Sequence, residues 1–329
     1  RIDRMREEGQ GRASRLKETR VDHRQRTLKT EVSCTGIGLH SGCKAGLTMK
    51  PAPPYTGIRF IRRDLPGRPE IHAVNGNVVG TNMSTSIGRD GVGVSTVEHL
   101  MAALFGLGID NVRVEVDGPE VPIMDGSSAP FVFLIKTAGV REQEEPKQFM
   151  VIRKRFRVED GNRSITIHPS RELKITYTID FDHPLLKNQR YVMRFSGGDF
   201  VREISRSRTF GFLKDIQLLR ENGLAMGGSL DNAIVIDDFR VLNEDGLRYP
   251  DEFVRHKILD FLGDLAILGC PVIGHFVVKK SGHFLNQVML RELIRNEKYW
   301  KIQSFKDRSE AAENRLRLPA FGRLEPVPA

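Results

Sequence analysis

Cysteine is scarce in this sequence, which holds three among 329 residues. Cys34, Cys43 and Cys270 are too few and too widely spaced for a disulfide framework, and without a CxxC pair they argue against a zinc site built from thiolates. This composition is typical of a protein that stays in a reducing compartment. We therefore expect a cytoplasmic location.

Long apolar runs are also missing. The most apolar stretch, residues 261–278, is interrupted by Asp264 and His275, whereas a helix that crosses a membrane needs roughly 20 apolar residues. Residues 1–26 are polar and contain no apolar run of the kind that a secretory signal requires. We expect neither a transmembrane segment nor a secretory signal.

Tyrosine and tryptophan are few, with five and one respectively, although the formal net charge is +9. A basic protein suggests a nucleic-acid partner, but this chain offers little aromatic surface for stacking on bases. Residues 1–26 alone hold nine basic and five acidic side chains, and we expect them to form a disordered basic leader. The remaining excess fits either a solvated basic surface or a phosphate-bearing small substrate, so no nucleic acid is expected as a partner.

Several widespread catalytic signatures are absent as well. The sequence has no GxxxxGK[ST], HExxH or GxSxG and no complete GxGxxG. The glycine-rich segment 36–42 could approach a ligand, but a tight turn between two strands is the simpler interpretation. The chemistry must therefore come from less familiar groupings of side chains.

What is present is enough apolar sequence for two folded domains, since 39% of the residues are hydrophobic. A charged break at residues 141–147 separates an N-terminal domain over 27–144 from a C-terminal domain over 147–306. Residues 307–329 are charged and then proline-rich, and we expect them to form a flexible tail.

Each half combines strand patterns with two helical patterns, which predicts two similarly built α+β domains. Segments such as 46–50, 57–61 and 111–116 alternate apolar and polar residues, as half-buried strands do. Helices are expected over residues 95–107, 130–139, 250–268 and 286–295, with a short helix near Asp199.

An insert of about residues 211–240 interrupts the second half. It combines a helical start, a glycine-rich turn and a short apolar strand. Its apolar lining could bind an apolar ligand or could equally be ordinary packing.

Glu98 and His99 form the first candidate site, because an adjacent carboxylate and imidazole among apolar neighbours are costly to bury without a partner. The pair could supply a metal ligand and a base. A structural alternative stays open: Ser95 and Glu98 have the spacing of a capping box, in which Glu98 would reach back to the Ser95 amide.

A second candidate lies in the helix expected over 250–268. His256, Asp260 and Asp264 are spaced i, i+4 and i+8, so they share one face of that helix. A histidine and an aspartate at this spacing can bind one metal ion, or can form a helix ion pair worth only a few tenths of a kcal/mol.

His283 is the third candidate, on a glycine-containing loop after Lys279 and Lys280. It could donate a proton or contact a phosphate, or could be an ordinary exposed histidine. Taken together, His99, His256 and Asp260 would give a metal three protein ligands and leave the fourth position to water, as in catalytic zinc sites. Glu98 would then be the general base and His283 the general acid of a hydrolytic site.

Six short motifs occur in an order that resembles a known enzyme family. They lie at residues 95–100 (STVEHL), 108–111 (GIDN), 122–126 (PIMDG), 207–211 (SRTFG), 253–257 (FVRHK) and 280–283 (KSGH). Over about residues 25–297 the chain resembles the UDP-3-O-acyl-N-acetylglucosamine deacetylases, the zinc amidases of lipid A biosynthesis.

This resemblance implies two domains of β-α-α-β layout, with the helices sandwiched between two sheets and a small insert in each domain. It implies one zinc ion held by His99, His256 and Asp260, and hydrolysis of an N-acetyl amide to a free amine and acetate.

The resemblance also implies roles for individual side chains. Glu98 would be the base, His283 the acid and Asp264 the group that orients His283. Thr209 would hold the oxyanion together with the zinc ion, with help from Lys257.

The substrate implied by the same resemblance is a UDP-linked acylated amino sugar. Its diphosphate would face Arg163, Lys257, Lys280 and His283, and its uracil would touch Phe181. The insert would line a passage for the 3-O-acyl chain with Phe210, Ile216, Ala225, Ala233 and Val235.

Two other functions remain as alternatives at this stage. One is a zinc deacetylase for a different N-acetylated sugar, and the other is a basic nucleic-acid-binding protein whose histidines and aspartates are structural. We expect the protein to be a monomer.

Overall fold

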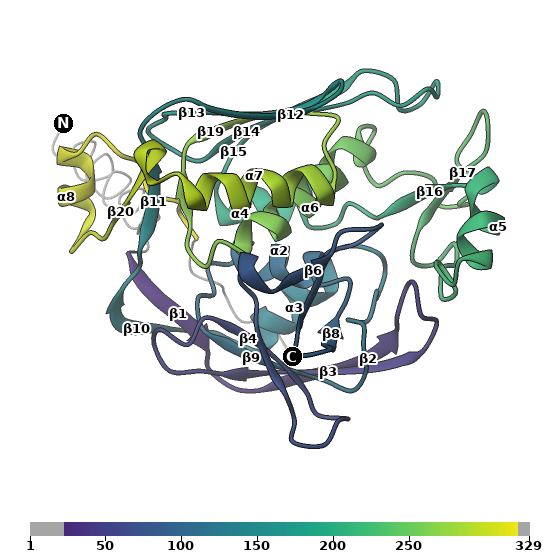
Figure 1. Cartoon of the computed structure of the whole chain (residues 1–329), viewed down its shortest axis with the longest axis horizontal. Helices are drawn as coiled ribbons and strands as arrows, with labels where there is room; N and C mark the ends of the chain where they lie inside the picture. The colour runs from purple at the N-terminus through teal and green to yellow at the C-terminus, as the bar shows by residue number, and fades with distance from the viewer. Residues whose placement is uncertain (1–22, 322–329) are drawn as a thin grey trace, which may run out of the picture.

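The computed structural model describes residues 23–321. A layer of helices lies between two five-stranded sheets (Figure 1). The sheet of the N-terminal half contains, in spatial order, β2 (Val32–Ile37), β3 (Lys44–Pro51), β9 (Val112–Val116), β4 (Ile58–Arg62) and β5 (Glu70–His72).

The sheet of the C-terminal half repeats this topology. Its spatial order is β12 (Phe156–Asp160), β13 (Arg163–His168), β19 (His275–Lys279), β14 (Lys174–Ile179) and β15 (Gln189–Arg194). In both sheets the third and fourth strands are parallel and the other neighbours are antiparallel. The predicted α+β class with two similarly built halves is confirmed.

Alternating side chains decide which face of each sheet is buried. In β4, Ile58, Phe60 and Arg62 are buried while Arg59 and Ile61 are partly exposed. Such alternation is expected of a mixed sheet that packs helices on one face and meets water on the other.

Four helices fill the space between the sheets. They are α2 (Glu98–Gly106), α3 (Ala129–Ala138), α6 (Glu252–Ala266) and α7 (His283–Arg295), close to the four predicted ranges. Helix α2 begins later than expected, because Thr96 has a left-handed φ of 55° and Ser95 forms a strand-like bridge with Glu120.

Helices α2 and α6 cross at very short range. A Cβ atom added to Gly263 of α6 would lie 2.1 Å from the backbone oxygen of Glu98 in α2. Only glycine allows this approach, which brings the first turn of α2 against the middle of α6.

Smaller sheets extend both halves. In the N-terminal half, the 3-10 turn η1 (Asn75–Asn77) precedes a three-stranded sheet of β6 (Val78–Gly80), β7 (Ser86–Arg89) and β8 (Val92–Val94). In the C-terminal half, β16 (Phe210–Phe212), α5 (Leu213–Glu221) and β17 (Ile234–Ile236) form a parallel β-α-β unit that projects from the body (Figure 1). This unit matches the predicted insert of about residues 211–240, except that it begins one residue earlier, at Phe210.

Two expected boundaries differ from the structure. Strand β1 (Arg24–Leu28) pairs with β10 (Val140–Pro146), so residues 24–26 are not part of a leader, and the charged break is a strand rather than a linker. The charged side chains of β10 are largely exposed while Gln143 is buried, which is how an edge strand accommodates a charged sequence. The rest of the predicted leader, residues 1–22, lies outside the described residues.

The C-terminal segment is packed further than expected. Strand β20 (Trp300–Gln303), preceded by η3 (Glu297–Tyr299), pairs with β11 (Phe149–Ile152), which also pairs with β18 (Val272–Ile273). Helix α8 (Arg308–Glu313) and the segment that ends at the buried Phe321 lie in the predicted flexible tail. Apolar burial explains this difference, and residues 322–329 lie outside the described part.

The short helix expected near Asp199 is present as α4 (Gly197–Asp199), followed by the π-helical turn η2 (Phe200–Ile204). Within residues 23–321, no helix combines the length and apolar character needed to cross a membrane.

The α2–α6 contact yields a stability prediction. Gly263→Ala should lower the free energy of unfolding by about 1–3 kcal/mol, because the added methyl group forces the two helices apart. Urea denaturation measures the effect. The control is Gly76→Ala, whose added Cβ meets no atom within 4 Å, and equal stability of both variants would contradict the prediction.

Candidate active site

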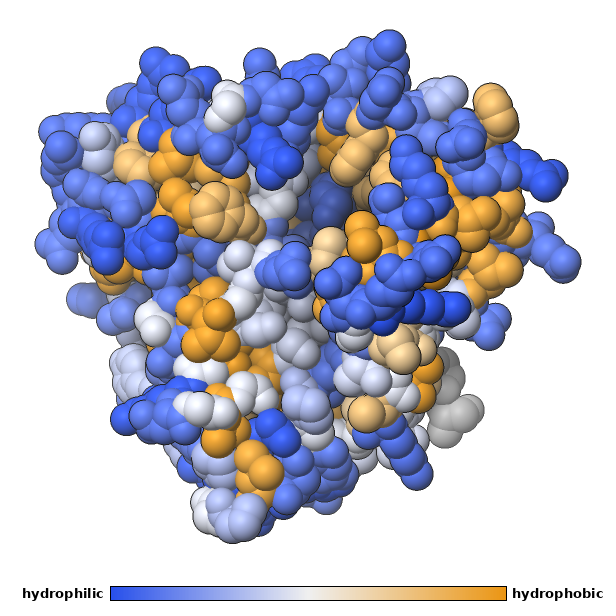
Figure 2. Space-filling view, turned by 45° about the vertical axis from the view of Figure 1, so that its right-hand side comes forward, coloured by the Kyte–Doolittle hydropathy of each residue, from blue (hydrophilic) through white to orange (hydrophobic). Residues whose placement is uncertain are grey.

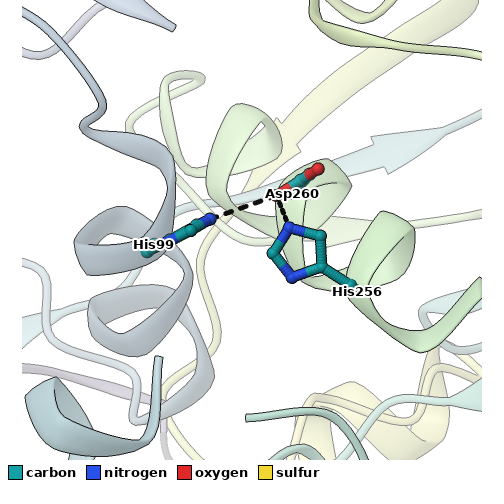
Figure 3. A group of neighbouring side chains, drawn as sticks. All are labelled: His99, His256 and Asp260. Carbon is teal, nitrogen blue, oxygen red and sulfur yellow. Dashed lines mark ion pairs between the residues drawn. The ribbon is translucent and has the colours of Figure 1, made fainter. Parts of the chain in front are cut away.

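The α2–α6 crossing brings together three side chains with metal-ligating atoms. His99 comes from α2, while His256 and Asp260 come from successive turns of α6 (Figure 3). Asp260 Oδ1 lies 3.2 Å from His256 Nε2 and 3.6 Å from His99 Nε2, and one ligand atom from each residue lies within 4.8 Å of the others. The contact between the two helices therefore brings together residues that lie far apart in the sequence.

The surroundings of this cluster favour a metal site over a simple ion pair. All three side chains are buried, and Asp260 Oδ1 has no hydrogen-bond partner within the described part of the chain. His256 Nδ1 lies 3.0 Å from the Ser207 carbonyl oxygen, which would orient its Nε2 toward Asp260. A helix ion pair does not explain why His99 of another helix shares the same carboxylate oxygen.

Charge also suits a cation. Burial lowers the pKa of His256 to about 3, which keeps the imidazole neutral and able to coordinate. Burial alone would raise the pKa of Asp260, but nearby charges, including the Lys257 ammonium 2.7 Å from Oδ2, hold it well below its usual range. The cluster thus presents two imidazoles, of which that of His256 is neutral, and one carboxylate.

Glu98 and His283 face each other beside this cluster. Glu98 Oε1 lies 3.7 Å from His283 Nε2, and Glu98 Oε2 accepts a hydrogen bond from the Thr85 backbone amide at 3.0 Å. The capping-box alternative is wrong, because the Ser95 hydroxyl donates to the Pro119 carbonyl and α2 begins without a side-chain cap.

The environment shifts the pKa values of this pair upward. Burial raises the pKa of Glu98, an effect that the positive charge of protonated His283 partly offsets. Burial would lower the pKa of His283, but the carboxylates of Asp264 and Glu98 outweigh it and raise the value to about 9. The carboxylate is therefore a better base than usual, and the imidazole stays protonated at neutral pH.

Asp264 anchors His283 through a network that the sequence did not reveal. Asp264 Oδ2 lies 3.0 Å from His283 Nδ1 and accepts a hydrogen bond from Asn286 Nδ2 at 2.7 Å. Asp264 Oδ1 accepts from Thr85 Oγ1 at 2.6 Å and from Gln287 Nε2 at 3.2 Å. Asn286 and Gln287 lie one turn after His283, and this spacing on α7 is the only signal that could have suggested them.

These groups open into one pocket of about 400 Å³. Figure 2 shows a hollow in this face of the molecule, with apolar residues beside it. The predicted site residues that line the pocket are Glu98, His99, Arg163, Phe181, Thr209, Phe210, His256, Lys257, Asp260, Lys280 and His283. Asp264 lies behind His283 rather than at the pocket surface.

Cations and aromatic rings occupy the outer part of the pocket. Lys280 Nζ lies 2.6 Å from Asp180 Oδ2, and Lys257 Nζ lies 5.8 Å from the centre of the Phe210 ring. The Phe181 and Phe210 rings meet edge to face at 5.9 Å. A phosphate group would find cations here, and a nucleobase would find aromatic rings.

Four predicted acyl-contact residues lie in the insert and outside the pocket lining. Ile216 borders a separate shallow depression on α5 with Leu213. Val235 is buried in β17, next to the partly exposed Ala233, and the Ala225 amide lies 3.4 Å from His40 Nδ1. The insert joins the pocket at Phe210, the first residue of β16.

Several lining residues were missed. Six of them lie on loops, where no periodicity marks them: Leu39, Thr81, Met83, Thr96, Ser281 and Gly282. Phe284 and Leu285 lie in the first turn of α7. The glycine-rich segment 36–42 does form a turn after β2, as predicted, but it also places Leu39 at the pocket.

Comparison with known proteins agrees with this geometry. The sequence pattern of the family described as UDP-3-O-acyl N-acetylglycosamine deacetylase matches residues 25–295, most of the chain. The chain belongs to this family. It is accordingly an enzyme, with the fold class and motifs of a UDP-3-O-acyl-N-acetylglucosamine deacetylase.

Relatives with this name are similar over nearly their whole length. The deacetylase of Myxococcus xanthus is 55% identical over 280 residues, which cover 85% of this chain and 89% of that protein. The proteins of Acidithiobacillus ferrooxidans and Methylococcus capsulatus are each 53% identical, and the matches cover 94% and 99% of those proteins. Each carries the name UDP-3-O-acyl-N-acetylglucosamine deacetylase.

The cluster makes a direct prediction about metal content. His256→Ala should lose bound metal and activity together, because the two remaining ligands are too few for a stable catalytic site. Elemental analysis of the purified variant, next to the unchanged protein, measures the metal. Full metal occupancy in this variant would contradict the assignment. The matched control is His168→Ala, because His168 lies at the other end of β13 from the pocket-lining Arg163.

Proposed function

We propose that this deacetylase hydrolyses the N-acetyl amide of a UDP-3-O-acyl-N-acetylglucosamine to a free amine and acetate. The observation that carries the proposal is one pocket that joins a three-residue metal cluster to a buried carboxylate–imidazole pair. The relatives, each named UDP-3-O-acyl-N-acetylglucosamine deacetylase, supply the substrate, an acylated UDP-sugar. In this family the reaction belongs to lipid A biosynthesis.

The cluster of His99, His256 and Asp260 would hold one zinc ion. Two imidazoles and one carboxylate are a typical ligand set of catalytic zinc, and the unpartnered Asp260 Oδ1 supplies a donor atom that burial without a cation would make costly. Bound there, zinc would act as a Lewis acid toward the amide carbonyl and would make water more acidic.

Glu98 would accept the proton of the attacking water. The bond from the water oxygen to the acetyl carbon opens the C=O bond to an oxyanion. When the C=O bond re-forms, the C–N bond breaks and the amine nitrogen needs a proton. His283, held protonated by Asp264, would donate it. Glu98 gains one proton and His283 loses one, and transfer between the two side chains, which are 3.7 Å apart, would restore both.

Thr209 and Lys257 would stabilise the oxyanion that develops during the attack. Both line the pocket, and Lys257 is fixed by its ion pair with Asp260. Arg163 and Lys280, which line the same pocket, would meet the diphosphate, and Phe181 would contact the uracil. The 3-O-acyl chain would run from Phe210 along the insert.

The free cysteine thiols support the proposed location in a reducing compartment. Cys34, Cys43 and Cys270 are free, and burial raises the pKa of Cys270 to about 12, which leaves a protonated and unreactive thiol. A cytoplasmic monomer with one zinc ion is the state that we propose.

Acetate release tests this function. Purified protein should release acetate from UDP-3-O-(3-hydroxyacyl)-N-acetylglucosamine, lose the activity on chelation and regain it when zinc is added. No release by zinc-loaded protein would contradict the proposal. Equal turnover of an N-acetylated sugar without UDP would instead support a deacetylase of different specificity.

Glu98→Gln tests the base. The variant should keep its metal and lose roughly 10²–10⁴-fold in kcat, because the amide accepts no proton at neutral pH. Its shape is preserved, so the hydrogen bond from the Thr85 amide can remain. Near-normal turnover in a steady-state assay would refute the assignment of Glu98.

A further inference from the structure

Glu120 is a buried carboxylate outside the catalytic pocket, on the segment that follows β9. We propose that Glu120 is a positioning residue: it fixes the loop on which the insert rests and thereby sets the length of acyl chain that the enzyme accepts. This inference rests on the proposed function, because it assigns a determinant of specificity to the same site.

The carboxylate holds the loop of residues 38–42 with both oxygens. Oε1 accepts a hydrogen bond from the His40 amide at 2.9 Å, and Oε2 accepts one from the Ser41 amide at 2.8 Å. Gly38 leaves room for this contact, since an added Cβ would lie 2.2 Å from Oε2. The turn has two backbone hydrogen bonds of its own, from the Gly38 amide to Cys43 and from the Gly42 amide to Gly38, and the carboxylate adds partners for the two amides between them.

The loop in turn carries the insert of the other half of the molecule. Two backbone amides of the insert donate hydrogen bonds to the loop. The Met226 amide donates to the His40 carbonyl oxygen at 3.1 Å, and the Gly227 amide donates to the Leu39 carbonyl oxygen at 3.0 Å. An added Cβ at Gly227 would lie 2.2 Å from the Gly38 oxygen, so the two backbones are in direct contact. Loop and insert therefore move as one unit.

This contact determines how far apart the two sides of the insert lie. Residues 225–228 connect α5 to β17, and these two elements carry the apolar residues Ile216 and Val235. Further attachments of the insert lie at its base, where the Thr209 amide donates to Gly126 and the Asn243 side chain bonds to Val235 and Ala233. Without Glu120 the base would stay in place while the turn is released, which changes the path of a long chain and leaves the catalytic groups where they are.

Glu120 has one further partner, the Thr96 hydroxyl, which donates to Oε1 at 2.9 Å. Thr96 precedes α2 and lines the pocket, so this bond links the same carboxylate to the catalytic helix. An experiment must therefore distinguish the bonds of Glu120 to the loop amides from its bond to the Thr96 hydroxyl.

Glu120→Gln is the decisive variant. Its amide nitrogen accepts no hydrogen bond, so one loop amide loses its partner although the side chain keeps its size. Amide exchange of residues 225–228, followed by mass spectrometry, should become faster. The KM for a long-chain substrate should rise roughly tenfold, as expected for one lost hydrogen bond, while kcat, metal content and the KM for a short-chain substrate stay unchanged.

Two controls isolate the proposed path. Thr96→Val removes only the bond toward α2, so exchange of residues 225–228 should remain normal. Glu115→Gln changes another buried carboxylate of the same half, which pairs with Lys50 and Arg68 away from the pocket, and should alter neither quantity. Gly227→Ala pushes the turn away from the loop without changing Glu120. It should likewise raise the KM for the long-chain substrate and leave the KM for the short-chain substrate unchanged.

Unchanged exchange in Glu120→Gln would overturn the proposal, as would a KM that rises equally for both chain lengths. The exchange measurement needs no substrate. A protein that fails to release acetate would therefore refute the proposed function and still report on the link between Glu120 and the insert.

Discussion

The contact between α2 and α6 is the constraint on which the site depends. Gly263 lets the backbone of α2 approach so closely that His99 reaches the carboxylate of Asp260. The same approach sets Glu98 against His283, whose helix packs beside α6. Because the side chains proposed as metal ligands and as acid–base groups come from both halves, neither half alone contains all of them.

Burial of so many polar groups is balanced by hydrogen-bond partners within the protein. Asp264 illustrates this balance: it is almost fully buried, yet its two oxygens have four partners, Thr85 and three residues of α7. Such a network fixes one rotamer of His283 before substrate arrives, which is the pre-organisation that proton transfer requires. Asp260 Oδ1 differs, because no hydrogen-bond donor meets it within the described residues, and this marks the place for a cation.

The sequence predicted the fold class and much of the site for reasons that can be stated. The i, i+4 spacing of His256 and Asp260 places both on one face of α6, and that local geometry is independent of the rest of the fold. Ser95 and Glu98 had equally good local spacing, but tertiary contacts overrode it when Glu98 turned to the Thr85 amide. Thr85 itself has no periodicity that distinguishes it, so its contacts with Glu98, Asp264 and His283 could emerge only from the folded chain. Strand β1 was missed because its pairing with β10 is a contact over more than a hundred residues, which a local reading of charged residues does not capture.

The aromatic ring of Phe321, near the end of the described chain, affects how substrate and products enter and leave the enzyme. Phe321 is buried against Gly108 and Gly197 and lies over the Lys147 ammonium, so it closes the helix layer at the ends of α2 and α6 opposite the metal ligands. The sugar and the acetate would then both leave through the pocket that His283 and Lys280 line. A bulky product that stays in this pocket would delay both the escape of acetate and the arrival of the next substrate, so turnover would depend on the departure of the deacetylated sugar.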